Sequence, residues 1–541
     1  MKIHNKKKWR SVYPLIRPHL GAIIAINLLT VLQSAAQVAL ALVTKSVIDG
    51  ALSGAEDFWR WAIALGGVLL CIVLLNTCLS WLSGSTTDKC TARMRQALLA
   101  AANRSDPERL QQFHSGQLLS RGMEDVRTVC DGFVVTLPSA LGLITRLIGA
   151  FIAIILLYPA IAPLLLLACA FIVGSTALLR PVMRRQHRLV RSADEQVITG
   201  MQENLQQLEL VQSLQMEKTT GQRFAGWIKK SLRIRRNRRL WSVGISTYLT
   251  AVSQLGTGAL LVWCALQVAD HAMTYGALTA MLQLLSMLRS PVLGLSGIWT
   301  RLSAVDVAAE RLCDLLDEPE DPETPVEATQ IHTIVFEDVT FHYPGDEAPV
   351  LEHLNLRLPL TGWTCLTGIS GKGKSTMFKL ILGLYQPQQG RVYLETDAGQ
   401  LDCSRHTRHL FAYVPQDYSL FTGTVAENLL MVAPEADESQ RRQALHTAQA
   451  DFVWELTTGE QTQLKENTGL SKGQLQRLAI ARAILMDRPV LLLDECTSAL
   501  DEQTEADLLN ALAKRNKQAL IVTHRPDALL SHNPTMISMD N

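Results

Sequence analysis

Charged residues are missing from several long stretches of this 541-residue chain. Arg146 is the only Asp, Glu, Lys or Arg in residues 133–179, where the prolines of segment 158–163 indicate a turn between two helices. The runs without any such residue are 20–44, 61–87, 240–269 and 272–288. Since about 20 apolar residues cross a bilayer, we predict six membrane-spanning helices. Six runs exclude a soluble protein, and a signal peptide would account for only one of them.

Cysteine pairs and metal-ligand spacings are also missing. The ten cysteines include no C-x-x-C pair, which argues against a disulfide framework and fits a reducing compartment for the soluble part. The net charge is only +1, so the composition gives no support for nucleic-acid binding. The basic run at residues 229–239 has an alternative interpretation as a nucleic-acid patch. We favour the membrane surface because this run directly precedes a membrane span.

Lys and Arg are concentrated in the long loops and absent from the short turns. Residues 88–131 and 180–239 are rich in both, as is the N-terminus, whereas the turns near 158–163 and 270–275 have neither. Because positively charged loops stay on the cytoplasmic side, we place the N-terminus and both ends of the membrane region in the cytoplasm. We expect a multi-pass protein of the bacterial cytoplasmic membrane.

The composition changes after residue 315. Residues 316–330 are acidic and rich in proline, which predicts a linker. Residues 331–541 alternate short β-type runs with helices and predict an α/β domain, whereas residues 1–315 form an α-helical membrane domain. Within the membrane domain, the cytoplasmic segment 196–224 has apolar residues at helical spacing and no proline, so we expect it to be helical.

A glycine-rich loop lies between a predicted strand (363–367) and a predicted helix (374–384). Residues 366–376 read LTGISGKGKST, and in this context G-x-x-G-x-G-K-S binds phosphates through backbone N–H groups and the helix N-terminus. Lys374 is expected to reach the terminal phosphates, and Ser375 to offer its hydroxyl to Mg²⁺. The domain is therefore a P-loop nucleotide-binding domain. Its other predicted ATP-binding loop residues are Gly368, Ser370, Gly371, Lys372, Gly373 and Thr376.

An apolar strand ending in two carboxylates follows further along the chain. Residues 490–495 read VLLLDE. Asp494 is expected in the Mg²⁺ shell, and Glu495 beside a water in line with the terminal phosphate, where a carboxylate can orient or deprotonate that water. An apolar strand ending in acid is weak evidence alone, but after a phosphate loop it strongly indicates ATP hydrolysis.

Residues 470–483 begin with a capping box, because Ser471 is followed three residues later by Gln474. Together with the two motifs above, LSKGQ resembles the signature sequence of the ATP-binding cassette (ABC) transporter family, and the resemblance extends over nearly the whole chain. It implies that Ser471, Lys472, Gly473 and Gln474 contact the terminal phosphate of ATP held by a second cassette. ATP would then be held between two cassettes, and one chain could not complete a site.

Other elements of the family occur in the expected order. Gln416, in YVPQD, resembles the Q-loop glutamine near Mg²⁺ and the attacking water, and His524, in VTHR, resembles the switch histidine. Tyr343, in FHYP, resembles the aromatic residue that stacks on adenine. Asp501 ends a D-loop, SALD, that reaches the partner cassette, and Glu466 resembles the acidic residue preceding the signature. Each residue alone has an ordinary interpretation in packing or at the surface, but the ordered set favours these roles.

The membrane half resembles the exporter branch whose half-transporters join six spans to one cassette. Residues 113–126 and 203–218 resemble the segments that carry the two cytoplasmic coupling helices. Lys472 replaces the usual signature glycine and opposes the helix dipole, yet it would face an anion, so we expect near-normal function. Lys372 adds a second charge to the phosphate loop. The chain ends soon after His524, which leaves open a short cassette or a truncated sequence.

These features predict an ATP-driven exporter that uses ATP and Mg²⁺ and works as a homodimer, with a heterodimer of related half-transporters as the rival. Its other partners are the lipid bilayer and the transported substrate, and no nucleic acid. The alternative function is an ATP-gated channel or regulatory membrane protein of the same architecture, although no regulatory insertion supports it. The sequence does not identify the cargo.

Two arginines lie inside apolar runs that contain no Asp or Glu. A central arginine costs about 2.5–3.5 kcal/mol on insertion scales, so Arg146 and Arg289 require a reason. In one interpretation, Arg289 extends to the interface and Arg146 bonds a polar side chain such as Gln33 or Gln37. In the other, both arginines face a cavity and favour an anionic peptide, lipid or small molecule.

Overall fold

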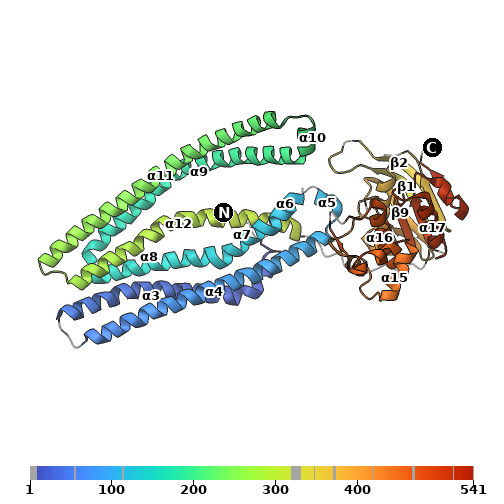
Figure 1. The fold of residues 1–541 in the computed structure, drawn as a ribbon. Helices are drawn as coiled ribbons and strands as arrows, with labels where there is room; N and C mark the ends of the chain where they lie inside the picture. Colours follow the sequence, from blue (N-terminus) through green and yellow to red (C-terminus); the bar gives the residue numbers. More distant parts are fainter. Residues whose placement is uncertain are drawn as a thin grey trace. The chain divides into compact units, whose positions relative to one another are not determined.

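The computed structural model divides the chain into two compact units (Figure 1). One unit comprises residues 1–101 and 118–317, and the other comprises residues 102–117 and 318–541. Most of the predicted linker, residues 318–329, lies outside the described residues. The residues that the structure describes are 9–53, 57–111, 115–317, 330–346, 348–369, 373–417, 419–465, 469–515 and 517–539.

Long helices occupy all six predicted span positions of the first unit. Among the described residues, four helical stretches are long and apolar enough to cross a membrane: Tyr13–Ser53, Phe58–Arg104, Leu118–Leu157 and Glu217–Ala269. The sixth position has the shorter apolar stretch Tyr275–Leu288, and many side chains of the fourth position lie outside the described residues. The helices are α3 (Leu20–Ser53), α4 (Phe58–Arg104), α8 (Leu137–Leu157), α9 (Ala162–Gln206), α11 (Glu217–Ala269) and α12 (Tyr275–Leu316).

Both predicted short turns are confirmed. The prolines of segment 158–163 form a single 3₁₀ turn, η4 (Pro159–Ile161), between α8 and α9. Between α11 and α12, His271 adopts the left-handed conformation with φ 57°. The Thr274 hydroxyl then accepts a hydrogen bond from the Ala277 amide and caps α12. The Asp49 carboxylate at the end of α3 also accepts a bond from Gly276 N at 3.0 Å, so α3 holds the start of α12.

Small residues bring the membrane helices together. A buried cluster around Ala41 (α3), Ala150 (α8) and Met281 (α12) joins three helices that pack on one another. Small side chains allow this close approach, which is the usual basis of helix association in a bilayer. Large apolar side chains on α4, such as Val73 and Leu74, are about 60% exposed, which suits a helix surrounded by lipid.

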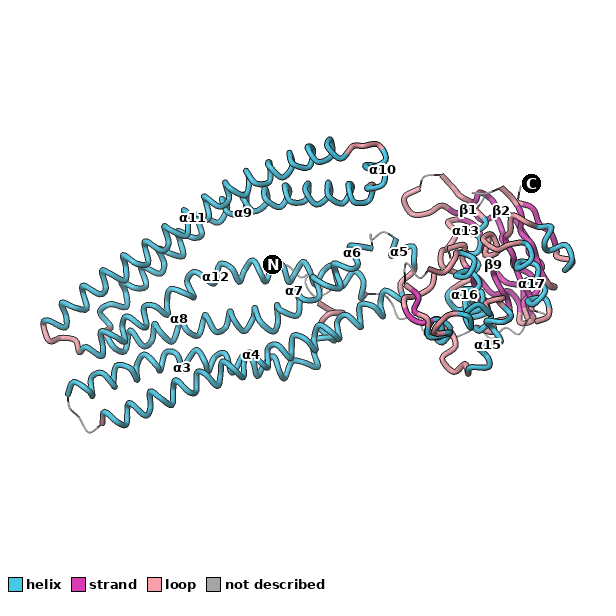
Figure 2. The backbone as a smooth tube through the Cα atoms, in the orientation of Figure 1, coloured by secondary structure: helices cyan, strands magenta, loops and turns pink. Residues whose placement is uncertain are grey.

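The predicted helical segment 196–224 is not one continuous helix. The chain turns between α9 and α11 through the short helix α10 (Leu208–Ser213), and Figure 2 shows α9 and α11 running side by side. Gln215 takes a left-handed φ of 55°, and Met216 N bonds Val211 O at 2.9 Å. Residues 207–216 contain neither glycine nor proline. The turn therefore leaves no break in the helical spacing from which it could be predicted.

The third long helix is also irregular. It begins as α6 (Ser115–Ser120) and passes through the π-helical turn η2 (Arg121–Asp125), helix α7 (Val126–Asp131) and the π-helical turn η3 (Gly132–Thr136) before α8. At η3, a Cβ on Gly132 would lie 2.5 Å from the Val305 side chain of α12. Glycine is therefore required where these two helices approach.

The second unit is built on a parallel sheet with strand order β11-β3-β10-β9-β6. The β-type runs of the sequence all fall on strands: IVFEDVTF, WTCLT, LFAYV, VLLLD and ALIVT. The buried residues form two clusters, one that includes the first helix after the phosphate loop and another beside α16. An antiparallel sheet, β2-β1-β4-β5, covers part of this core. The parallel strands are β3 (Trp363–Thr367), β6 (Phe411–Val414), β9 (Val490–Asp494), β10 (Gln518–Val522) and β11 (Thr535–Ser538). The antiparallel strands are β1 (Ile331–Phe341), β2 (Leu351–Pro359), β4 (Gln389–Thr396) and β5 (Gly399–Asp402).

The helix after the phosphate loop ends earlier than predicted. Helix α13 (Lys374–Ile381) is followed by Gly383 in the left-handed conformation, with φ 58°. Gly383 N bonds Leu380 O at 3.0 Å and Leu384 N bonds Lys379 O at 2.9 Å, which is a Schellman motif. Gly383 was thus the sequence signal for the C-terminal end of α13. The remaining helices of the unit are α14 (Val425–Leu430), α15 (Glu438–Thr447), α16 (Lys472–Leu485) and α17 (Glu502–Ala513).

Residues 102–117, which contain the short helix α5 (Pro107–Gln111), group with the ATP-binding fold. The Arg405 guanidinium donates to Arg104 O at 3.0 Å, and Asp106 is close enough to Arg408 to favour its charged form. Both of these contacts precede residues 113–126, the segment in which we predict the first coupling helix. Residues 112–114 lie outside the described part.

Candidate functional site

The phosphate loop joins β3 to α13 as predicted. Gly373 adopts the left-handed conformation, with φ 86°, and a Cβ there would lie 2.6 Å from the Leu351 side chain, so only glycine fits. Lys374 is buried, and its Nζ donates to Gly368 O at 2.7 Å and to Ile369 O at 3.1 Å. Its charge is therefore held inside the loop. The other predicted loop residues, Ser370, Gly371 and Lys372, lie outside the described residues.

Asp494 ends β9 in a buried position, 1% exposed. The Tyr413 hydroxyl donates to Asp494 Oδ2 at 3.3 Å, and the Ser375 hydroxyl also hydrogen-bonds this carboxylate. Burial raises the pKa of Asp494, and these two hydrogen bonds oppose that shift. The other carboxylate oxygen, Oδ1, is buried and has no hydrogen-bond partner among the described residues. The two predicted Mg²⁺ ligands Ser375 and Asp494 thus meet, and one carboxylate oxygen remains available.

The three predicted catalytic residues are in direct contact. Gln416 Nε2 donates to Glu495 Oε2 at 2.8 Å, and His524 Nε2 lies 2.9 Å from Glu495 Oε1. Glu495 has a left-handed φ of 49°, and its N–H bonds Val522 O at 3.0 Å on β10. The residues follow β6, β9 and β10, which are neighbours in the parallel sheet. The cluster therefore lies at the carboxyl edge of the sheet, where α/β proteins bind ligands.

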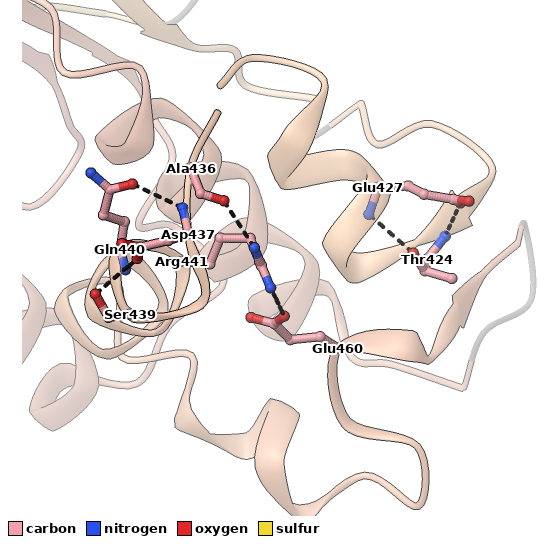
Figure 3. Close-up of polar contacts among 8 residues, drawn as sticks. All are labelled: Thr424, Glu427, Ala436, Asp437, Ser439, Gln440, Arg441 and Glu460. Atoms are coloured by element: carbon pink, nitrogen blue, oxygen red, sulfur yellow. Dashed lines mark hydrogen bonds and ion pairs between the residues drawn. The ribbon is translucent and has the colours of Figure 1, made fainter. Parts of the chain in front are cut away.

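The signature residues form the predicted capping box. The Ser471 hydroxyl accepts from Gln474 N at 3.2 Å, and Gln474 Oε1 accepts from Ser471 N at 2.8 Å. Lys472 is the exposed first residue of α16. A Cβ on Gly473 would lie 2.8 Å from Ala499 O, so the signature packs on the D-loop. Capping boxes of the same kind begin α14 at Thr424 and α15 at Asp437 (Figure 3). Neither helix follows the phosphate loop directly in the sequence.

The remaining predicted residues have structural contacts of their own. The Tyr343 hydroxyl lies 3.0 Å from Thr376 Oγ1 and accepts from Lys379 Nζ at 3.2 Å, which holds the ring beside the start of α13. Asp501 caps α17 by accepting from Thr504 N at 3.0 Å. Glu466 lies outside the described residues.

Sequence reasoning missed Tyr413 and Lys379. Tyr413 lies on β6, which pairs in parallel with β9, and this pairing brings its hydroxyl to Asp494. The only local signal was its position three residues before Gln416. Lys379 follows Ser375 by one helical turn and places its ammonium 5.1 Å from the Tyr343 ring centroid.

A second candidate site is a cavity of about 390 Å³ in the membrane unit. Arg146 from α8 lines it together with Gln33, Asn76 and several Ser and Thr side chains. Gln33 Nε2 donates to Asn76 Oδ1 at 3.3 Å. Arg146 Nε is buried and has no hydrogen-bond partner in the part of the chain that the structure describes. The Arg289 side chain lies outside that part.

Both halves of the chain match models of known protein families. The model of the ABC transporter transmembrane region matches residues 23–292, and that of the ABC transporter matches residues 351–498. An ATP-dependent lipid A-core flippase of Sodalis glossinidius is 28% identical over 539 residues, which cover 96% of this chain and 90% of the relative.

Two further comparisons extend this likeness. A lactococcin transport/processing ATP-binding protein LcnC-like of Lactococcus lactis is 29% identical over 436 residues, covering 78% of this chain and 60% of the relative. The solved structure of a bacterial Atm1-family ABC exporter with ATP bound has the same fold, with a TM-score of 0.80 at 20% identity. The match covers 96% of this chain and 94% of that chain.

Proposed function

This chain belongs to the ABC transporter family, as an exporter-type half-transporter that joins a membrane region to one ATP-binding cassette, and we propose that two copies of it export an anionic cargo by alternating access. The observation that carries the proposal is the Gln416–Glu495–His524 cluster beside the phosphate loop. We take residues 1–315 as the transmembrane domain, 316–330 as the linker and 331–541 as the cassette.

In the proposed reaction, Glu495 orients the attacking water or accepts its proton. Its carboxylate is held from both sides by Gln416 and His524, so its direction is fixed before nucleotide arrives, as electrostatic preorganisation requires. His524 would move from Glu495 to the terminal phosphate. Lys374, which now bonds two loop carbonyls, would bond phosphate oxygens instead. Tyr343, half-buried beside α13, would face the adenine.

The residues around Asp494 fit a magnesium ion. Mg²⁺ prefers oxygen ligands and keeps several waters, and Asp494 Oδ1 is a buried oxygen without a hydrogen-bond partner among the described residues. Ser375 and the side-chain oxygen of Gln416 would complete the protein ligands. When bound, Mg²⁺ would neutralise charge on the phosphates during transfer.

A second copy would complete each ATP site. In the proposed homodimer, Ser471, Lys472, Gly473 and Gln474 would approach the terminal phosphate bound by the other chain, because the N-terminus of α16 favours an anion. Asp501 would help join the two cassettes. The rival is a heterodimer with a related half-transporter, but this chain has both the Glu495 cluster and a capped signature helix, so neither half of a site is lost.

We propose that the N-terminus and the cassette are cytoplasmic and that the membrane is the bacterial inner membrane. The support for the orientation is the basic character of residues 88–131 and 180–239. Helix α10, which we propose as the second coupling helix, lies within the second of these segments.

The anionic cargo is proposed from the cavity that Arg146 lines. A buried guanidinium Nε without a partner is costly unless a ligand or water satisfies it, and the cavity contains polar partners for the rest of a ligand. In a homodimer two such arginines would be present. The named activities of relatives include flipping of lipid A-core and transport or processing of lactococcin.

Transport in inside-out vesicles tests this function. Ligands that copurify with the chain would be identified by mass spectrometry, and their ATP-dependent accumulation would then be measured with wild-type protein and with Glu495→Gln. We expect accumulation that needs ATP and is lost in the variant. Downhill leakage opened by ATP, without accumulation, would instead indicate an ATP-gated channel.

A further inference from the structure

A groove of about 640 Å³ lies between α9 and α11, apart from the Arg146 cavity. Leu178 on α9 and Leu240, Trp241, Ile245 and Tyr248 on α11 line it. The α11 residues recur every three or four positions and therefore share one helix face. Trp241 is 48% and Leu178 80% exposed, so the apolar walls are open to a ligand.

The two helices that form the groove are held in a fixed register. Asp194 on α9 accepts from Arg235 Nη2 on α11 at 2.8 Å and from the Ser231 hydroxyl at 3.1 Å. Further along, a Cβ on Gly200 would lie 2.0 Å from the Trp227 ring, so α9 has no side chain where the indole packs. The groove is thus preformed by the chain itself.

One end of the groove is strongly basic. Arg233 precedes the groove residue Asn237 by four positions, about 6 Å along α11, and Arg185 follows Leu178 by seven, about 10 Å along α9. Both spacings keep the arginines on the groove faces of their helices. Residues 218–269 contain no Asp or Glu, and neither Arg185 nor Arg233 has a carboxylate partner among the described residues.

The aromatic side chains lie where this basic end meets the apolar run. Trp241 lies two residues after Arg239, at the start of the uncharged segment 240–269, and Tyr248 lies two helical turns further along the same segment. Trp and Tyr are enriched at membrane–water interfaces, because their rings are apolar and their N–H or O–H groups are polar. Basic pockets between helices on the cytoplasmic side bind anionic lipid headgroups.

We propose that this groove binds one anionic phospholipid per chain as a resident membrane component, with acyl chains along Trp241 and Tyr248 and the phosphate near Arg185 and Arg233. The inference rests on the orientation proposed above. Charge favours this occupant, because the basic end of the groove complements an anionic headgroup. The groove is also separate from the Arg146 cavity assigned to cargo.

Filling the groove tests the apolar part of the proposal. A Cβ on Gly244 has no atom within 4 Å, so Gly244→Phe can place a ring in the groove without moving the backbone. Gly256→Phe is the matched control, because Gly256 is equally open on the same helix but lies outside the groove. Delipidated full-length protein would be titrated with phosphatidylglycerol or phosphatidylcholine, and retained lipids counted by native mass spectrometry.

We expect wild type and Gly256→Phe to retain one more phosphatidylglycerol per chain than Gly244→Phe, and no such difference for phosphatidylcholine. Equal retention of phosphatidylglycerol by all three proteins would overturn the proposal. The proposal would also be overturned if a second copy of the chain covers the groove. In that case Gly244→Phe would lose the dimer without any difference in lipid retention.

The headgroup site is tested by Arg233→Gln against Arg239→Gln. Arg239 has the same charge on the same helix but lies about 200° round from Trp241, away from the groove. A basic residue near an anionic lipid surface contributes about fivefold in affinity. We expect Arg233→Gln to weaken phosphatidylglycerol binding about fivefold and Arg239→Gln to have little effect. Equal weakening by both would overturn a specific site in favour of general surface charge.

The same samples separate this inference from the proposed function. ATP hydrolysis would be measured on each preparation, with Glu495→Gln as the inactive reference. If lipid retention shows no dependence on the groove while wild-type hydrolysis remains intact, only the groove proposal fails. If hydrolysis itself survives in Glu495→Gln, the assigned catalytic role fails independently of the lipid result.

Discussion

The catalytic cluster of the cassette and Arg146 of the membrane unit hold their charges in opposite ways. In the cassette, the Glu495 carboxylate has Gln416 and His524 on either side, and Lys374 bonds two carbonyls. In the membrane unit, Arg146 Nε is buried without a partner among the described residues, beside a cavity. The Glu495 cluster is thus preorganised for one chemistry, whereas Arg146 leaves a buried donor available to a ligand. Substitutions should accordingly have larger and more specific effects in the cassette.

The largest effect should come from Glu495→Gln. The variant keeps the size of the side chain but removes the charge that orients or deprotonates water, so hydrolysis should fall by about 100-fold or more, while nucleotide still binds. Hydrolysis and ATP binding would be measured separately in lipid nanodiscs. Glu502→Gln, an exposed acid at the start of α17, is the control and should remain near wild type. Wild-type turnover in Glu495→Gln would remove this residue from catalysis.

A stability effect should follow from Glu460→Ala. Glu460 is 8% exposed and accepts two bonds from Arg441, at 3.0 and 3.1 Å (Figure 3). Removing one member of a buried pair leaves the other without compensation, at a cost of about 3 kcal/mol, or roughly 6–12 °C in unfolding temperature for a domain of this size. Thermal unfolding of the full-length chain measures it.

The matched control for Glu460 is Glu337→Ala. Glu337 accepts from Arg391 at 2.6 Å, but both side chains are about half exposed, and exposed pairs contribute little. We expect a much smaller change in unfolding temperature. Equal losses in the two variants would mean that burial does not set the strength of ion pairs in the cassette.

Ser471→Ala should have a moderate effect that separates capping from catalysis. Loss of the cap costs about 1 kcal/mol, and loss of a bond to a charged phosphate should lower turnover about tenfold. Asp437→Ala removes the corresponding cap of α15 (Figure 3), which has no proposed contact with ATP. A drop in turnover of similar size in Asp437→Ala would show that Ser471 acts only through helix stability.

In the membrane unit, Arg146→Gln should reduce stimulation of ATP hydrolysis by anions. The test compares an alkyl phosphate with an alkylammonium ion of the same chain length. Loss of one charge contact of about 1 kcal/mol should weaken the apparent affinity for the anion about fivefold. Arg60→Gln removes an exposed, salt-bridged arginine and is the control. Equal or stronger stimulation by the cation, unchanged by Arg146→Gln, would contradict an anionic cargo.

The smallest effect should be a pH shift in Tyr413→Phe. Burial raises the pKa of Asp494, and the Tyr413 hydrogen bond opposes that shift. Removing the donor should raise the pKa further, so that Mg²⁺-dependent hydrolysis is lost at a higher pH as the solution is acidified. The pH profile of turnover measures this shift. Movement of the acid limb to lower pH would show that the hydroxyl does not stabilise the carboxylate.

How far the sequence predicts the structure also differs between the units. In the cassette, strand runs and motif loops follow local rules, so β3, β9 and the capping box of α16 could be located from their residues. The contact of Tyr413 with Asp494 could not, because it depends on the pairing of β6 with β9 across a long loop. The end of α13 was marked by Gly383, but the prediction extended the helix past it to the apolar residue Leu384.

In the membrane unit, composition predicts where helices lie but little of how they meet. The turn at Gln215 has no glycine or proline, so a helical pattern continues through it. The two π-helical turns around α7 leave no simple periodic signal. The isolation of Arg146 could be inferred from the absence of Asp and Glu, but its cavity depends on residues from three helices.

The central claim is that each ATP site combines the Glu495 cluster of one chain with the signature of a second copy. It is tested by coexpressing Glu495→Gln chains with Ser471→Arg chains under two affinity tags and purifying the mixed dimers. Each variant alone should be inactive, whereas the mixed dimer retains one intact site formed by the unaltered halves. We predict that it recovers ATP hydrolysis at up to about half the wild-type rate. Mixed dimers that form but remain as inactive as either parent would contradict the claim.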